Sequence, residues 1–148
     1  MNEVYTNIWV SDIRDAQTHP KDDFDRIITV CQDPIEDNVS DGCAYEWYNM
    51  SDGEAEYGGD DSQELFDDAV RSVLASFMCR ETILVHCHAG QSRSVSVVAA
   101  AITVIEHNHH LDNKNLDEML NLVQSRRGDV QTNPLMVEKA ESFVGRYT

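Results

Sequence analysis

The sequence predicts a single α/β domain, residues 1–148, in which helices flank a mostly parallel central sheet of four to five strands. Short, β-branched segments alternate along the chain with longer segments of helical periodicity, and this alternation is typical of parallel sheets covered by helices. A length of 148 residues suits one domain with a single core. No internal repeat or low-complexity linker divides the chain.

Three strands are expected in the first fifty residues. Residues 7–10 (NIWV) read as a short strand, and Ser11-Asp12 can cap a helical turn after it. Residues 26–31 (RIITVC) are β-branched and fit a buried strand. Residues 44–50 (AYEWYNM) give the third strand.

An acidic, glycine-containing loop is expected over residues 51–60, followed by a long helix. Asp61 and Glu64 can form a capping box at the start of this helix. Its apolar residues recur with helical spacing to about Cys79. The first half of the chain therefore ends in an amphipathic helix.

One strand and three helices are expected in the second half. Residues 82–86 form a strand, and residues 94–105 are almost all small or apolar, as in a buried central helix. Residues 115–127 are amphipathic. The pair Asn133-Pro134 is typical of a helix start and begins a last helix that reaches about Tyr147.

The segment from Val85 to Ser94, VHCHAGQSRS, carries the chemistry that the sequence predicts. It joins a strand to a helix start, so several backbone N–H groups point at one spot and can bind a phosphate dianion. The same field lowers the pKa of Cys87 and makes its thiolate a competent nucleophile. Arg93, six positions later, can hold two phosphoryl oxygens through its planar guanidinium.

The residues His86-Cys87-x5-Arg93-Ser94 resemble the signature of cysteine-dependent protein phosphatases. The fuller wording, HCHAGQSRS, is similar to the dual-specificity branch of that superfamily. The resemblance covers nearly the whole chain and implies a protein tyrosine phosphatase-like fold. An ordinary buried cysteine before a helix would not require an arginine where the anion sits.

The resemblance also implies a role for each residue of the segment. Cys87 is the nucleophile and Arg93 the anion clamp. Ser94 gives a hydroxyl that hydrogen-bonds the cysteine sulfur and helps it leave, although a serine is also ordinary in a first helical turn. His86 orients the loop from behind. Phosphate contacts are expected from Arg93 and, mainly through backbone N–H groups, from His88, Ala89, Gly90, Gln91 and Ser92, with Gly90 present for backbone geometry.

Family members take the general acid from a loop after an upstream strand, and Asp52 fits this position best. It would protonate the leaving oxygen and then, as a carboxylate, activate water. Asp60 and Asp61 are the rival candidates, although capping of the next helix already accounts for them. Arg127 and Asn133 lie in a segment that resembles one packed near the phosphate loop in the family. Asn133 stays outside the expected catalytic set, since helix capping explains it equally well. Arg127 could assist an anionic substrate, but the sequence favours a surface arginine.

These residues favour a dual-specificity type of phosphatase that acts on phosphotyrosine, and on phosphoserine and phosphothreonine, in phosphorylated proteins. The resemblance disfavours a phosphatase of non-protein phosphate esters, because relatives that act on lipid phosphates carry lysines in this loop and those that act on RNA 5′-triphosphates have a different loop sequence. Residues 88–92 contain no lysine. A non-catalytic phosphate-recognition module is disfavoured because the cysteine, the arginine and the acid are all present. A sulfurtransferase is disfavoured by His86 and the Arg93-Ser94 pair.

The charge is extreme for this length. The 27 acidic residues outnumber the 11 basic ones, giving a formal charge of −16, and only three residues are lysines. The hydrophobic content of 41% and the apolar periodicity argue against a disordered acidic protein. We interpret the chain as a folded protein adapted to high salt, haloarchaeal or from a virus of a halophile. So negative a surface disfavours nucleic acids and anionic membranes as partners.

The four cysteines show neither a C-x-x-C spacing nor a secretory signal before them, so a cytoplasmic, reducing location is expected. The longest apolar run, residues 95–105, is too short to span a bilayer. The three histidines His107, His109 and His110 could be taken for a metal site, but they more readily complement the dipole at a helix end. The implied chemistry requires no metal and no cofactor, and we expect a monomer.

Overall fold

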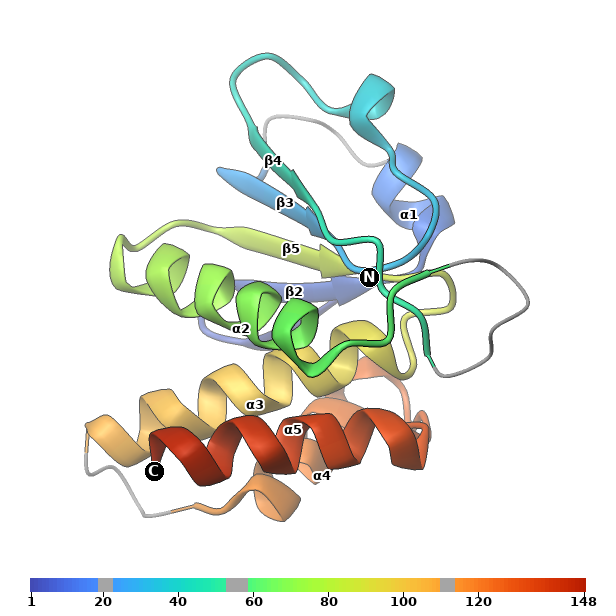
Figure 1. The fold of residues 1–148 in the computed structure, drawn as a ribbon. Coiled ribbons are helices and arrows are strands. Elements are labelled where there is room, and N and C mark those ends of the chain that lie inside the picture. The colour runs from blue at the N-terminus through green and yellow to red at the C-terminus, as the bar shows by residue number, and fades with distance from the viewer. Residues whose placement is uncertain (19–22, 53–58, 110–113) are drawn as a thin grey trace.

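A five-stranded sheet with the strand order β1-β2-β5-β3-β4 forms the centre of the computed structural model, which describes residues 1–18, 23–52, 59–109 and 114–148 (Figure 1). β1 runs antiparallel to β2, and every other neighbouring pair is parallel. This arrangement confirms the predicted α/β class. The strands are β1 Asn2–Tyr5, β2 Ile8–Ser11, β3 Arg26–Thr29, β4 Ala44–Trp47 and β5 Ile83–His86.

Helices cover both faces of the sheet. α2, α3, α4 and α5 lie on one side in Figure 1, and the short α1 lies on the other. α3 is buried along residues 93–105 and packs against β2, β5 and the three other helices of its side, so it is the expected central helix. The helices are α1 Ile13–Thr18, α2 Gln63–Met78, α3 Arg93–Asn108, α4 Leu116–Arg127 and α5 Pro134–Tyr147, with a 3-10 turn over Glu36–Asn38.

β5 is central and buried on both faces, as its continuous apolar sequence requires. Ile83 and Val85 belong to the large core under α2, α3, α4 and α5. Leu84 points to the opposite face and packs with Ala16 of α1 in a smaller core. Alternation along a strand thus divides one apolar segment between two cores.

Several expected boundaries were wrong by a few residues. β3 and β4 end at Thr29 and Trp47 instead of residues 31 and 50, because the chain leaves the sheet there to enter the site. β1 was not predicted, since only Val4 in this short edge strand is buried. α3 begins at Arg93 and continues to Asn108, beyond the expected end at residue 105, because its last residues stay helical after they leave the core.

The expected capping box of Asp61 and Glu64 does not start α2. Ser62 is the N-cap instead, and its hydroxyl accepts a hydrogen bond from the Leu65 N–H at 3.2 Å. Both residue types suit an N-cap, so spacing alone could not separate neighbours. Asp12 does cap the first turn of α1 as expected, accepting from the Asp15 N–H at 2.8 Å. None of the described helices is long and apolar enough to cross a membrane.

Candidate active site

The loop from β5 to α3 lies at the carboxyl edge of the parallel strands, where sheets of this kind place ligands. Gly90 in this loop has a φ of 69°. A Cβ built on it would lie 2.7 Å from the Ser11 carbonyl group and 2.9 Å from Arg127 Nη2. The tight, left-handed turn therefore requires glycine, in agreement with the backbone role expected for Gly90.

Cys87 is 2% exposed at the start of this loop. Its sulfur lies 3.2 Å from Ser94 Oγ and accepts a hydrogen bond from the Gly90 N–H at 3.2 Å. Burial by itself raises the pKa of Cys87, but hydrogen bonds from the Ser94 side chain and backbone, the charge of Arg93 and the Gly90 N–H together lower it below the ordinary value. The site therefore favours a thiolate.

Arg93 is 7% exposed, and the first turn of α3 directs its guanidinium toward the loop. Nη1 donates to Gln32 Oε1 at 2.6 Å and to the Met50 carbonyl at 2.9 Å. Gln32 was not anticipated from the sequence. It follows β3 on the same edge of the sheet, and a search for polar residues just after each expected strand would have found it.

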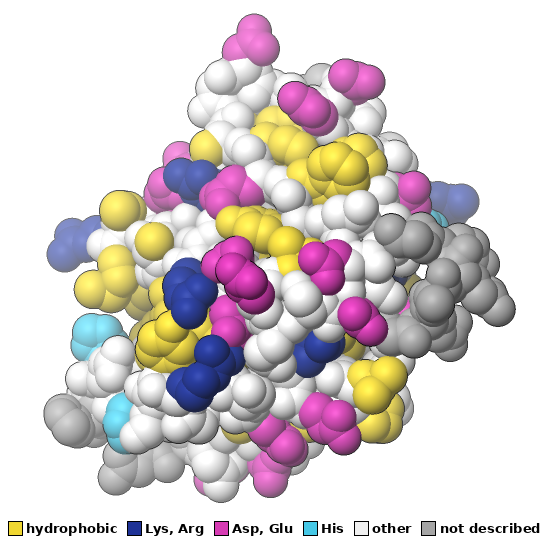
Figure 2. All heavy atoms as spheres, in the orientation of Figure 1, with side chains coloured by type: hydrophobic (Ala, Val, Ile, Leu, Met, Phe, Trp, Pro, Cys, Tyr) yellow, Lys and Arg dark blue, Asp and Glu magenta, His cyan; other side chains and the backbone are white. Residues whose placement is uncertain are grey.

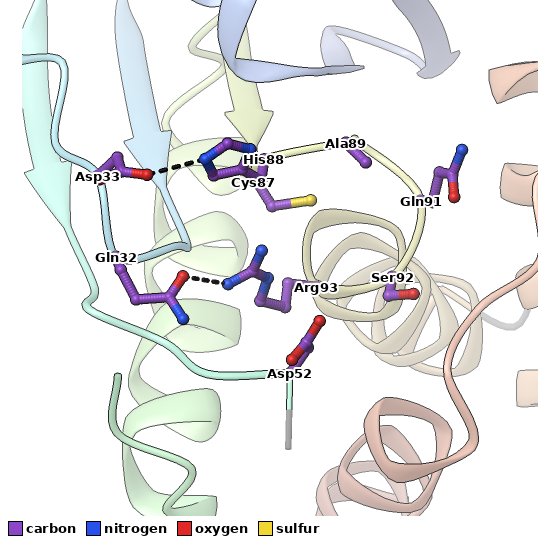
Figure 3. A pocket seen from close by; sticks show the side chains of 9 residues that line it. All are labelled: Gln32, Asp33, Asp52, Cys87, His88, Ala89, Gln91, Ser92 and Arg93. Carbon is purple, nitrogen blue, oxygen red and sulfur yellow. Dashed lines mark hydrogen bonds and ion pairs between the residues drawn. The ribbon is translucent and has the colours of Figure 1, made fainter. Parts of the chain in front are cut away.

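A cavity of about 520 Å³ opens above the loop (Figure 3). Figure 3 shows the thiol of Cys87, the guanidinium of Arg93 and the carboxylate of Asp52 around the same space. The lining residues are Gln32, Asp33, Asp52, Cys87, His88, Ala89, Gln91, Ser92 and Arg93. The structure therefore brings together residues from the ends of three parallel strands.

Asp52 follows β4 and lines this cavity, whereas neither rival aspartate does. The Asp60 carboxylate accepts a hydrogen bond from the Ser62 N–H at 2.8 Å, and the Asp61 carbonyl accepts one from Lys139. The Asp60 carboxylate is thus engaged just before α2, and Asp61 contacts Lys139 of α5 through its backbone. Of the expected acidic loop, residues 53–58 lie outside the described residues.

His86 is fully buried behind the loop, between β3 and the Cys87 peptide. Its Nε2 lies 2.6 Å from Thr29 Oγ1, and its Nδ1 lies 3.2 Å from the Cys87 carbonyl oxygen. Because the Tyr45 hydroxyl donates to Thr29 Oγ1, Thr29 can donate in turn to Nε2, which leaves the proton on Nδ1. Burial lowers the pKa of His86 to about 4, so the ring is neutral. This geometry fits a supporting histidine.

The side chains of the other loop residues differ in placement. His88 is exposed at the cavity mouth, and its Nε2 lies 2.8 Å from the Asp33 carboxylate. Ala89, Gln91 and Ser92 line the cavity. Gly90 contributes through its backbone, as described above.

Arg127 and Asn133 contact the site more closely than a surface arginine and a helix cap would require. Arg127 donates from Nε to the Gly90 carbonyl at 3.0 Å. Asn133 caps α5 through its side-chain oxygen, which accepts from the Leu135 N–H at 2.9 Å. It also donates from Nδ2 to the Asp52 carbonyl at 3.1 Å and from its backbone N–H to Ser92 Oγ at 2.9 Å. Capping alone therefore does not account for Asn133.

No group of three or more His, Cys, Asp or Glu residues is arranged to hold a metal ion in the part of the chain that the structure describes. His107 and His109 are exposed at the end of α3, which fits the expected role at a helix end. His110 lies outside the described residues.

No family model matches this sequence, and no curated protein sequence matches it. Solved structures do match its fold. Human DUSP28, a dual-specificity phosphatase, has a TM-score of 0.77 at 17% identity, over 99% of this chain and 96% of that one. The tyrosine phosphatase OH1 from the Orf virus has a TM-score of 0.74 at 11% identity, over 99% and 86%.

A human tyrosine phosphatase-like serine/threonine/tyrosine-interacting protein also matches, with a TM-score of 0.73 at 18% identity over 99% of this chain and 97% of that one. The chain thus has the fold of the dual-specificity phosphatases, as the signature implied. Because a fold alone does not fix a function, the residues of the site have to decide between catalysis and binding.

Proposed function

We propose that this chain is a cysteine-dependent phosphatase that hydrolyses phosphotyrosine, phosphoserine and phosphothreonine monoesters on proteins. The observation that carries the proposal is the environment of Cys87. A thiol with a lowered pKa, a buried arginine and an aspartate meet around one cavity at a helix start. A nucleophile, an anion clamp and a proton donor are the groups that phosphoryl transfer through cysteine requires.

In the first step the Cys87 thiolate attacks phosphorus, and an S–P bond forms as the P–O bond to the leaving oxygen breaks. Asp52 gives its proton to that oxygen, so the substrate leaves as an alcohol or phenol. Arg93 and the backbone N–H groups of the loop stabilise the charge on the phosphoryl oxygens. The products are the dephosphorylated side chain and a cysteinyl phosphate.

In the second step water attacks the cysteinyl phosphate, and the Asp52 carboxylate takes the proton from that water. The S–P bond breaks, and the sulfur leaves as a thiolate. Ser94 lies 3.2 Å from the sulfur and can donate its hydroxyl proton into a hydrogen bond as the negative charge returns. Inorganic phosphate then leaves the cavity.

The decisive experiment is hydrolysis of para-nitrophenyl phosphate at high potassium chloride, with wild type and Cys87→Ser compared. We expect turnover in the wild type without added metal and none in the variant. Phosphopeptides assayed beside phosphoinositides would then test the substrate class. Turnover that survives in Cys87→Ser would contradict the thiolate mechanism.

A folded wild type without any turnover would instead favour a phosphate-recognition module. Binding of tungstate, an oxyanion that resembles phosphate, would then persist without hydrolysis. A phosphatase of non-protein esters would be favoured by turnover of the phosphoinositides but not of the phosphopeptides.

A further inference from the structure

Arg93 is held from one end of its guanidinium. Both of its hydrogen bonds to Gln32 and to the Met50 carbonyl start from Nη1. Since the guanidinium is planar and rigid, two acceptors on one terminal nitrogen fix the plane of the whole group. The opposite edge, formed by Nε and Nη2, is then the edge that can present two parallel N–H groups to an anion.

Gln32 is itself well placed to hold this position. It follows β3 at the carboxyl edge of the sheet and lines the cavity, and Figure 3 shows its amide directed at the guanidinium. A Cβ built on Gly59 would lie only 3.1 Å from Gln32 Cγ, so Gly59 itself packs closely against the glutamine side chain. This packing limits the rotamers that Gln32 can adopt.

Both acceptors on Nη1 are neutral carbonyl oxygens. A carboxylate in the place of the Gln32 amide would make a charge-assisted bond of similar geometry, but it would also offset the charge of Arg93. Asp33 already brings a carboxylate to the cavity, and the whole chain carries −16. A neutral partner therefore preserves the cation of the site.

We propose that Gln32 is a positioning residue for Arg93, which orients the Nε–Nη2 edge toward the phosphate without adding a negative charge. The inference rests on the proposed function, because it takes the cavity to be a phosphate site. It predicts two separable effects of substitution: loss of orientation when the amide is removed, and loss of positive potential when the amide becomes a carboxylate.

The experiment compares wild type, Gln32→Ala and Gln32→Glu by two readouts that require no turnover. Tungstate affinity is measured by calorimetry. Alkylation of Cys87 by iodoacetamide is followed against pH by peptide mass spectrometry. Gln131→Ala is the matched control, because Gln131 is an exposed glutamine outside the cavity. Circular dichroism establishes that each variant is folded.

We expect Gln32→Ala to weaken tungstate binding about tenfold, as for the loss of one hydrogen bond to a charged group, with little change in the alkylation midpoint. Gln32→Glu should weaken binding by at least as much and also move the midpoint to higher pH, because the added charge destabilises the thiolate. Gln131→Ala should match the wild type in both readouts.

Unchanged tungstate binding in folded Gln32→Ala would overturn the role of Gln32 in orienting Arg93. An unchanged alkylation midpoint in Gln32→Glu would overturn the role of its neutrality. A wild type that binds no tungstate and alkylates like an ordinary thiol would overturn the proposed function and this inference together. The three results are distinct, so a failure of the inference is separable from a failure of the proposed function.

Discussion

At the scale of single residues, the site holds its two most important groups with neutral partners. The Cys87 sulfur is hydrogen-bonded by the Ser94 hydroxyl and by backbone N–H groups. Arg93 donates to the side-chain oxygen of Gln32 and to a backbone carbonyl oxygen. The thiolate and the guanidinium are therefore the principal opposite charges at the base of the cavity, and each stabilises the other. The carboxylate of Asp52 enters from a separate loop, so its role can be tested without disturbing either group.

Asp52→Asn should remove the general acid and leave the phosphate loop intact. We expect kcat for phenyl phosphate to fall roughly 100- to 1,000-fold, as for the loss of a positioned proton donor. The loss should be smaller for para-nitrophenyl phosphate, because its leaving group needs less protonation. Steady-state kinetics of both proteins on the two substrates check this.

Asp60→Asn is the control for this substitution, since the Asp60 carboxylate lies outside the cavity and accepts a hydrogen bond from the Ser62 N–H. It should keep the wild-type rates on both substrates. The opposite result, with full rate in Asp52→Asn and loss of rate in Asp60→Asn, would assign the acid to Asp60.

His86 links the stability of the fold to pH. Its pKa falls from 6.5 to about 4 in the folded protein, mainly through burial, so between these values the unfolded chain binds more protons. The contribution of neutral His86 is complete above pH 6.5 and is lost as pH falls toward 4. It amounts to about 3 kcal/mol of unfolding free energy.

His86→Asn should therefore flatten the pH dependence of the unfolding free energy between pH 4 and 6.5. Urea denaturation of both proteins at several pH values measures the difference, in which the titration of the many surface carboxylates cancels. An identical slope in the two proteins would show that His86 does not titrate with unfolding.

At the scale of elements, the sequence predicted the central strands and the long helices because their apolar patterns are strong. β5 and α3 are almost wholly buried, so nearly every residue of each carries the signal. β1 was not predicted because a short edge strand with one buried residue has almost no hydrophobic pattern. The cap of α2 was misplaced because two adjacent residues suit the same position.

The residues of the candidate site also differ in how well the sequence predicts them. Cys87 and Arg93 lie on one continuous segment, so their spacing is visible in the sequence. Gln32 contacts Arg93 from 61 residues away, and Asn133 reaches Asp52 across 81. Such contacts depend on which strand and helix ends meet in space, and no local pattern records that.

From the contacts of Asn133 we predict that the start of α5 controls the position of Asp52, the proposed proton donor. Asn133→Asp keeps an oxygen that can cap α5 but loses the N–H donor to the Asp52 carbonyl. We expect stability to change by less than about 0.5 kcal/mol. Turnover of phenyl phosphate, whose leaving group needs protonation, should fall about tenfold more than turnover of para-nitrophenyl phosphate.

Asn115→Asp makes the same change at the N-cap of α4, where the side chain accepts from the Glu118 N–H at 3.0 Å. It should leave the ratio of the two rates unchanged. An equal loss on both substrates in Asn133→Asp would indicate general damage to the site, and an unchanged ratio with full rates would show that Asn133 does not position Asp52.

At the scale of the whole molecule, the acidic excess is the dominant electrostatic feature. On the face that Figure 2 displays, acidic side chains are scattered, with fewer basic ones among them. Some charges are compensated locally, as where Arg26 lies 2.7 Å from both Glu46 and Glu81. With 27 acidic and 11 basic residues, most of the negative charge has no such compensation, and it repels both itself and a dianionic substrate.

We therefore predict that stability and activity both rise as potassium chloride increases from about 0.1 M toward molar concentrations, where the Debye length falls from about 10 Å to about 3 Å. Screening removes repulsion within the acidic surface and between that surface and the substrate. The Arg26 network is only partly exposed, so it should weaken less than the repulsion it opposes. Thermal unfolding and kcat/KM across the salt series measure the two effects.

A parallel series with sucrose at equal osmolality separates screening from general exclusion of solute, because sucrose carries no charge. A stability maximum at low salt would contradict adaptation to high salt, and an equal gain in sucrose would show that screening is not its cause.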